Sequence, residues 1–361
     1  MRKTQVALAA MALVASTAAL ADGVTVYGVL DVGVTSTNNG TSTARAFGGA
    51  GTESPSYIGF KGSEDLGNGM KASFNLEAGL NSGTGALGNG SGSANSAASY
   101  AAGAVTTNIF ARAANVGVDG EFGAVKLGVV MDPAFLAALG VDPRGMGNGN
   151  GTALAHWGFT QTNYSPNTFT GIFNPNSVLY TSPNINGLQV SGSYGLGGTS
   201  GSRQDGSQAI GITYAAGNLN FAGWSNTIYQ DSANAKLYTN QGVGAGLAIS
   251  ETLSIKAYIN KVQTYSTSNV VTAERNTTGL GGTYALQDNV KLTVAYYTKD
   301  NNMVANSDIT QWVTNLTYTI SPRTSAYFTY VSENNKAETG SYATGTYKNA
   351  SFTGVGILHS F

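Results

Sequence analysis

The chain has 361 residues, of which 42% are hydrophobic and only 10% are charged, and its formal net charge is −1 at pH 7. Soluble domains usually carry about 25% charged residues, so a chain of this length is not expected to expose its whole outer surface to water. It contains no cysteine, which excludes disulfides, thiolate metal sites and a cysteine nucleophile. The near-neutral charge argues against a nucleic-acid partner.

Residues 1–21 have the pattern of a secretory signal peptide. Arg2 and Lys3 form a basic start, an apolar stretch of small residues follows, and Ala19-Leu20-Ala21 predicts cleavage after Ala21. The alternative is an N-terminal membrane anchor, which the shortness of the apolar stretch disfavours. Cleavage leaves 18 − 2 = 16 basic and 19 acidic residues, a net charge of −3, on a single domain over 22–361.

Beyond this segment the dominant period is two, which is typical of β-strands with one apolar face. In Val290–Lys299, for example, Val290, Leu292 and Val294 alternate with Lys291 and Thr293. Segments of this kind predict sixteen strands. Their expected ranges are 24–34, 56–65, 70–80, 108–118, 123–130, 176–182, 188–197, 207–216, 219–230, 235–249, 253–264, 274–286, 290–300, 307–320, 323–334 and 349–361.

The connections between these strands alternate in length. Tight turns rich in Gly, Asn, Asp, Ser and Pro alternate with mostly longer links, including 35–55, 81–107, 131–175, 265–273 and 335–348. Short turns at one end and long loops at the other are typical of an all-β, 16-stranded antiparallel transmembrane β-barrel. A two-sheet soluble sandwich is the alternative, but it does not explain the low charge. A barrel of this size is too wide for its own side chains to fill, so its lumen should hold water.

Several segments, in order and spacing, resemble the trimeric general porins of the Gram-negative outer membrane, in particular their beta-proteobacterial branch. They are VTVYGVLD at 24–31, IGFKGSEDLG at 58–67, MKASFNLE at 70–77, ANVGV at 114–118, GEFG at 120–123, NSVLYTSPN at 176–184 and GVGILHSF at 354–361. The resemblance implies an outer-membrane channel for passive diffusion of ions and of small hydrophilic or neutral solutes. It also implies a homotrimer in contact with outer-membrane lipids, with no cofactor and no enzymatic activity.

In that family the third long loop, here about 131–175, folds inward and narrows the pore. Charged rings at such a narrowing select ions. The terminal Phe361, on a strand with Val355 and Ile357 on the same face, resembles the signal read by the outer-membrane assembly machinery. The alternative for Phe361 is an ordinary last strand with an exposed end.

The chain departs from its relatives where the family carries arginines on the wall of the barrel. Tyr57, Leu179 and Val129 stand at such positions, and the charged residues between 127 and 202 are only Asp132, Asp142 and Arg144. We therefore predict a weakly charged, partly apolar constriction. The expected residues of the lumen and constriction are Asp31, Tyr57, Lys61, Lys71, Glu77, Arg112, Asp132, Phe135 and Leu179. The alternative is that the loop lies elsewhere and these residues pack at the trimer contact.

Other functions are less well supported by the residues. The chain has only His156 and His359 to act as histidine bases and no Gly-x-Ser-x-Gly motif, which disfavours a hydrolase. Asp132 and Asp142 could contribute to a Ca²⁺ site, but two carboxylates ten residues apart are more often unrelated, so no metal is predicted. The remaining alternative is a barrel whose long loops bind an external partner, as an adhesin or receptor, with little or no conductance.

Overall fold

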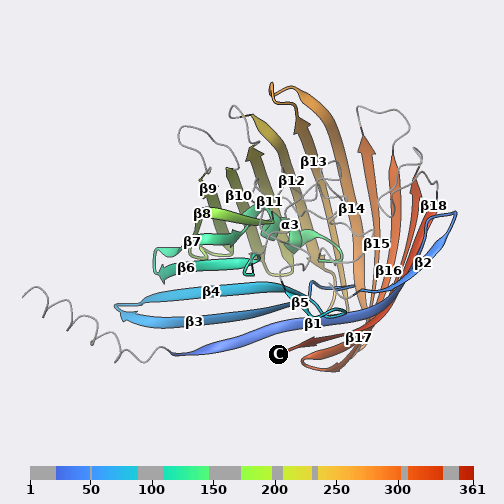
Figure 1. Ribbon diagram of the computed structural model, residues 1–361, viewed down its shortest axis with the longest axis horizontal. Coiled ribbons are helices and arrows are strands. Elements are labelled where there is room, and N and C mark those ends of the chain that lie inside the picture. The colour runs from blue at the N-terminus through green and yellow to red at the C-terminus, as the bar shows by residue number, and fades with distance from the viewer. Residues whose placement is uncertain are drawn as a thin grey trace, which may run out of the picture.

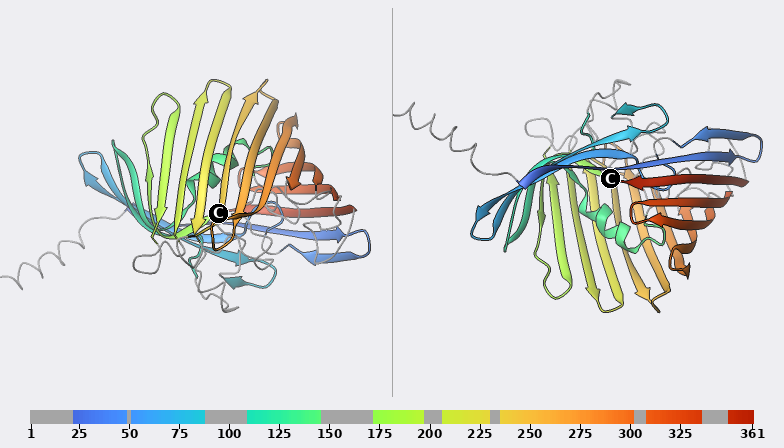
Figure 2. Two further views of the ribbon diagram at one scale, coloured as in Figure 1. Left: turned by 90° about the horizontal axis from the view of Figure 1, so that it is seen from above. Right: turned by 90° about the horizontal axis from the view of Figure 1, so that it is seen from below.

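The computed structural model describes residues 22–48, 51–87, 109–145, 172–196, 206–229, 235–301, 308–335 and 349–361 (Figures 1 and 2). The signal-peptide segment and most of the loop 131–175 lie outside these ranges. The described residues contain no helix that is long and apolar enough to cross a membrane.

Sixteen antiparallel strands form a closed ring, and two short strands, β2 (Thr43–Phe47) and β5 (Ala86–Leu87), extend loops above it. The ring strands are β1 (Asp22–Asn38), β3 (Tyr57–Gly67), β4 (Met70–Asn81), β6 (Ala113–Gly120), β7 (Gly123–Met131), β8 (Phe173–Thr181), β9 (Leu188–Gly195), β10 (Ser207–Ala216), β11 (Leu219–Tyr229), β12 (Lys236–Ala248), β13 (Leu253–Tyr265), β14 (Val271–Gln287), β15 (Val290–Asn301), β16 (Ile309–Ser321), β17 (Thr324–Asn335) and β18 (Asn349–Ser360). One described helix, α3 (Pro133–Val141), lies on the inner side of the sheet (Figure 2).

The first strand closes the barrel because it pairs with two neighbours. Its first part pairs with β3 and its second part, from Val29 onward, pairs with β18. At the change of partner, Gly28 exchanges two backbone hydrogen bonds with Phe361, of 3.2 and 3.1 Å. The last residue of the chain therefore belongs to the closing ladder, which satisfies backbone groups that would otherwise form an open edge.

The outer face of the barrel is apolar, and aromatic side chains lie near both ends of the strands. Val355, Ile357 and Phe361 are 55%, 54% and 39% exposed, so they face outward. Outward aromatic residues near the short-turn end are Tyr214, Phe221, Tyr284 and Tyr318, and those near the long-loop end are Tyr194 and Trp312. Two aromatic bands flanking an apolar belt fit a barrel that sits in a bilayer.

The predicted strand order and number are confirmed, and most boundaries agree within two residues. The range 207–216 is reproduced by β10. Three starts differ more: the strand predicted from 108 begins at Ala113, β8 begins at Phe173 rather than 176, and β14 begins at Val271 rather than 274. The first loop also contains β2, which pairs with the upper end of β1 and extends that strand to Asn38.

Substitution of Gly28 tests the closure. A Cβ atom here would lie 2.5 Å from the Tyr57 carbonyl oxygen and 2.6 Å from the Phe361 ring, whereas Gly23 on the same strand has nothing within 4 Å. We expect Gly28→Ala to destabilise the folded barrel by about 1–3 kcal/mol, because the added methyl group would clash with strand backbone that cannot move aside. Thermal unfolding followed by circular dichroism measures the effect, with Gly23→Ala as the control. Equal midpoints for the two variants would contradict the assigned seam.

Candidate functional site

Helix α3 packs inside the barrel against β10, β11 and β12. The helix is short and almost uniformly apolar, and six of its residues are buried. A helix that is apolar all round is stable only when it is covered on several sides. The inner wall provides one of those sides, so the segment is built to lie inside the lumen rather than outside the barrel.

Glycines on the wall create the space that the helix occupies. A Cβ atom at Gly211 would lie 2.2 Å from the Pro133 carbonyl oxygen, and one at Gly244 would lie 2.5 Å from a Val141 methyl group. The same holds beyond the helix, where a Cβ atom at Gly281 would lie 2.8 Å from the Pro143 ring. The backbone of the wall is therefore in direct contact with the segment at these three glycines, and this fixes the position of the segment.

Asp132 begins the helix and also ties it to the wall. One carboxylate oxygen accepts the backbone N–H groups of Ala134 and Phe135, at 2.8 and 3.1 Å, which is an N-cap. The other oxygen accepts the side-chain amides of Asn174 on β8 and Asn226 on β11. The carboxyl group is fully buried, and burial raises its pKa to about 7 despite these four donors.

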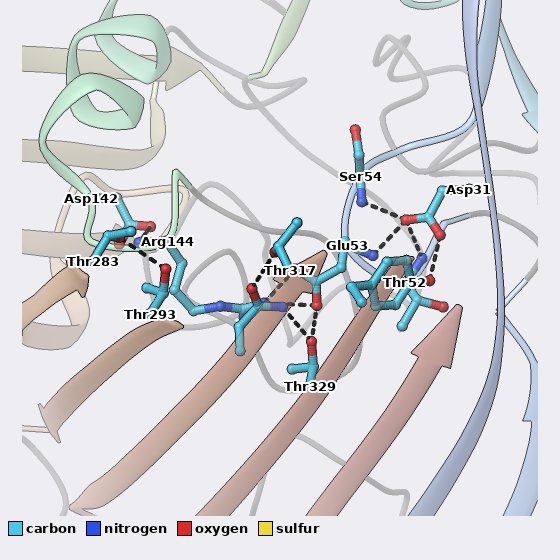
Figure 3. Close-up of polar contacts among 12 residues, drawn as sticks. Asp31, Thr52, Glu53, Ser54, Asp142, Arg144, Thr283, Thr293, Thr317 and Thr329 are labelled. Atoms are coloured by element: carbon cyan, nitrogen blue, oxygen red, sulfur yellow. Dashed lines mark hydrogen bonds and ion pairs between the residues drawn. The ribbon is translucent and has the colours of Figure 1, made fainter. Parts of the chain in front are cut away.

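The other end of the helix continues across the lumen. Asp142 follows the helix and accepts a hydrogen bond from the Tyr297 hydroxyl on β15, at 3.1 Å. Two residues later, Arg144 forms an ion pair of 3.0 Å with Glu53, which belongs to the first long loop, and Glu53 also accepts from the Thr329 hydroxyl on β17 (Figure 3). The segment that follows α3 and the first long loop are thus joined to each other on the inner side of β14–β17.

The position of Glu53 depends on Asp31. The Asp31 carboxylate on β1 accepts three consecutive backbone N–H groups, from Thr52, Glu53 and Ser54, at 3.0, 2.6 and 2.7 Å (Figure 3). Tyr327 donates its hydroxyl to the other oxygen. Asp31 therefore lies on the inner face, but it is fully buried. It holds a loop and does not present a charge to the lumen.

The wall formed by β3, β4 and β6 carries the predicted basic residues. It begins half-way round the ring from β12, the last of the three strands that hold α3, and near its other end Arg112 stacks 4.9 Å from the ring centre of Phe173, which belongs to the apolar cluster around α3. Arg112 lies here, 3.5 Å from Glu77, with its guanidinium 4.6 Å from the Tyr57 ring centre. Arg112 is only 6% exposed and Glu77 only 7%. The structure thus brings three predicted residues together as a compensated pair beside an aromatic ring.

The remaining predicted residues lie apart from this group. Lys61 is exposed on the inner face, 4.9 Å above the Tyr27 ring centre, and Lys71 lies closer to the short turns. Leu179 is on the inner face of β8 but only 9% exposed. Phe135 is buried in the apolar cluster around α3, so it packs the helix against its surroundings and does not line open lumen.

Part of the inner wall is sealed from water. Val313, Val331 and Phe352 lie on the inner face of β16, β17 and β18, and each is at most 1% exposed. They belong to the same apolar cluster as α3. The lumen is therefore partly filled at mid-height, which the apolar character of the sequence between 127 and 202 indicated in general terms.

Sequence reasoning named Asp31 and Asp132 as lumen residues but did not find that they position the inward segments. The helix itself was not predicted, because nine residues give too short a periodic pattern. A proline following an aspartate at 132–133 was the available signal for its start. Glu53 was missed because nothing local distinguishes it from any other loop carboxylate.

These features define the class: a closed apolar-surfaced barrel with a charged inner wall and inward loop segments is an outer-membrane channel barrel. The family model described as Gram-negative porin matches residues 7–338. The chain belongs to the Gram-negative porin family, and its location is the outer membrane.

Relatives and solved structures agree with this assignment. Outer membrane porin protein 32 of Delftia acidovorans is 31% identical over 197 residues, which cover 54% of this chain and 49% of that protein. An outer membrane porin protein of Bordetella pertussis is 28% identical over 311 residues, covering 82% of this chain and 69% of that protein. The chain thus spans about half to two thirds of the length of these relatives. An anion-selective porin from Comamonas acidovorans has the same fold, with a TM-score of 0.76 at 20% identity, covering 94% of this chain and 99% of that one.

The docking of α3 should depend on pH through Asp132. Its pKa is raised from 3.8 to about 7, so the docked helix favours the protonated form. The stabilisation is greatest at low pH and is lost as the pH rises from about 4 to 7, an effect on the order of a few kcal/mol. We expect single-channel current noise to increase from pH 5 to pH 8 in the wild type.

The matched variants are Asp132→Asn, which keeps a capping side chain but cannot titrate, and Asp119→Asn on the inner face of β6. The first should flatten the pH profile and the second should leave it unchanged. A profile that persists in Asp132→Asn would assign the pH dependence to another group.

Proposed function

We propose that the protein forms a water-filled channel through the outer membrane for passive diffusion of small solutes and ions. The observation that carries the proposal is the closed sixteen-strand ring around a wall that bears Lys61, Lys71 and other exposed polar groups. Charged groups of this kind face inward only where water reaches them. Family membership favours a channel over an enzyme.

We further propose that the constriction lies between α3 with its continuation to Arg144 and the wall at Tyr57 and Arg112. Both arginines there are compensated, Arg112 by Glu77 and Arg144 by Glu53. A compensated pair produces a much weaker field at a passing ion than an isolated charge does. This supports a constriction with weak ion selectivity.

The remaining parts of the proposal concern export and assembly. Residues 1–21 act as a cleaved signal peptide, and Phe361 contributes to recognition by the outer-membrane assembly machinery. The barrel assembles as a homotrimer in outer-membrane lipid. A trimer form of OmpT of Vibrio cholerae, with a TM-score of 0.62 at 15% identity over 94% of this chain and 99% of that one, supports the idea of a trimer through its fold.

Swelling of liposomes containing the refolded protein tests the channel directly. We expect swelling in isotonic solutions of small neutral sugars, with a rate that falls steeply as the sugar becomes larger. In planar bilayers the conductance should rise in groups of three equal steps. Liposomes that remain impermeable to every sugar would refute the channel and favour a barrel whose loops bind a partner.

Glu77 and Arg112 test the compensated pair. We expect Glu77→Gln to shift the reversal potential toward anions, because Arg112 then lacks its counter-charge, and Arg112→Gln to shift it toward cations. The double variant should return close to the wild type, since it removes both charges. Reversal potentials in a salt gradient measure all three. No shift in either single variant would place the pair away from the ion path.

A further inference from the structure

The inner wall carries lysines that form no ion pair within the described part of the chain. Lys61, Lys126, Lys256 and Lys291 lie on β3, β7, β13 and β15, and none of them takes part in a salt bridge there. A fifth, Lys71 on β4, lies between Asp65 and Asp119 in the strand register. The arginines of the inward-facing segments, in contrast, are paired.

Neighbours of known orientation show that these lysines face the lumen. Lys61 is paired in register with Asn75, which accepts the Tyr27 hydroxyl inside the barrel. The Lys126 side chain lies beside Gly117 and the Lys256 side chain beside Gly246, both on neighbouring strands.

The remaining positions follow from alternation along the strands. Lys256 is two residues from Tyr258, which is buried in the inner cluster with Tyr297. Lys291 alternates with the outward-facing Val294 and is paired with Thr317, whose hydroxyl bonds the inner Asn315. All four unpaired lysines are therefore inside the barrel.

All five lysines also lie on the same side of the constriction. Each is within six residues of a short turn, and at a rise of about 3.3 Å per residue on tilted strands this places them roughly 3–15 Å above the turns. Glu77 and Tyr297 lie seven or eight residues above their turns, nearer mid-height.

The charge balance of this half of the lumen is positive. Five lysines less the carboxylates of Asp65 and Asp119 leave +3 on the inner face. At the rim the turns carry Glu121, Glu251 and Asp288 against Arg323, but these groups face bulk solvent, where salt screens them more effectively. Asp142 lies above Lys256 and attracts it electrostatically, and the hydrogen bond from the neutral Tyr297 hydroxyl leaves its charge in place. Counting this carboxylate lowers the balance to 5 − 2 − 1 = +2. Low-dielectric walls around the lysines concentrate their field in the lumen.

We propose that Lys61, Lys126, Lys256 and Lys291, with Lys71, form a lysine vestibule on the short-turn side of the constriction, which concentrates small multivalent anions such as phosphate or carboxylates. The proposal rests on the proposed channel function and assigns its ion preference to the vestibule. The preference for anions is therefore set by the summed electric field of the lysines, which acts over several ångströms of water, while the constriction itself stays nearly neutral.

The test is the reversal potential of the full-length refolded protein in planar bilayers, measured in KCl gradients centred near 0.1 M and near 1 M. In the wild type we expect anion preference at low salt and little preference at high salt, because the Debye length falls from about 10 Å to about 3 Å. Replacing Lys61, Lys126, Lys256 and Lys291 together by Gln should reduce the anion-to-cation permeability ratio at low salt by roughly three- to tenfold. Added inorganic phosphate should lower chloride current in the wild type and not in this variant.

Three further variants keep the result interpretable. The single change Lys61→Gln should give a partial shift even if the quadruple variant folds poorly, and four Lys→Arg changes should preserve the preference. Lys261→Gln should have no effect, since Lys261 pairs with Glu274 at 3.1 Å and, by alternation with the inner Tyr258, lies on the outer face. A conducting quadruple Gln variant with an unchanged reversal potential would overturn the vestibule alone. A wild type that neither conducts nor swells liposomes would instead refute the channel.

Discussion

The structure depends on one constraint: inside a bilayer, every backbone N–H and C=O group must be paired within the protein. A closed sheet meets this constraint, and here β1 completes the closure by pairing with β3 and then with β18. The closure requires Gly28, where the carbonyl of Tyr57 and the ring of Phe361 approach the backbone too closely for a side chain. The inward loop segments are attached to the barrel wall, and the wall is continuous because β1 pairs with both β3 and β18.

Closing sixteen strands creates the opposite problem, a lumen too wide to select among solutes. Loop segments narrow it, and each needs a way to bury backbone against the wall. For α3 the wall provides glycines and Asn side chains at β8 and β11, while Asp132 satisfies the start of the helix. For the first loop, Asp31 satisfies three successive amides. In both cases a buried carboxylate is used as a hydrogen-bond acceptor for a loop and does not contribute an open charge to the pore.

The sequence predicted the fold better than the site, and the reason is the range of the interactions. Strand positions follow from alternation between neighbours such as Leu292 and Thr293, which is visible in any short window. The pairing of Arg144 with Glu53 joins residues 91 positions apart, and no local pattern reports such a distance. Arg112 was placed on the wall only through resemblance to a family, and its partner Glu77 was expected as a separate lumen charge. The scarcity of charge between 127 and 202 predicts a weakly charged constriction, and the structure adds that Arg144 is paired with Glu53 while Asp132 and Asp142 accept hydrogen bonds from neutral groups.

The pairing of the arginines and the separate position of the lysines explain how a channel of this kind can select for size in one region and for charge in another. A charge at the narrowest point must be partly desolvated, and a buried ion without its partner costs several kcal/mol; Arg112 and Arg144 avoid this cost by pairing. The lysines lie between the proposed constriction and the short turns and are exposed or half-buried, so they need no partner and act on ions through the solvent. In the proposed channel, size discrimination then belongs to the packed segment around α3, and charge discrimination belongs to the region of the lysines. Because the two depend on different distances, salt concentration separates them: it weakens the field of the lysines without changing the shape of the constriction.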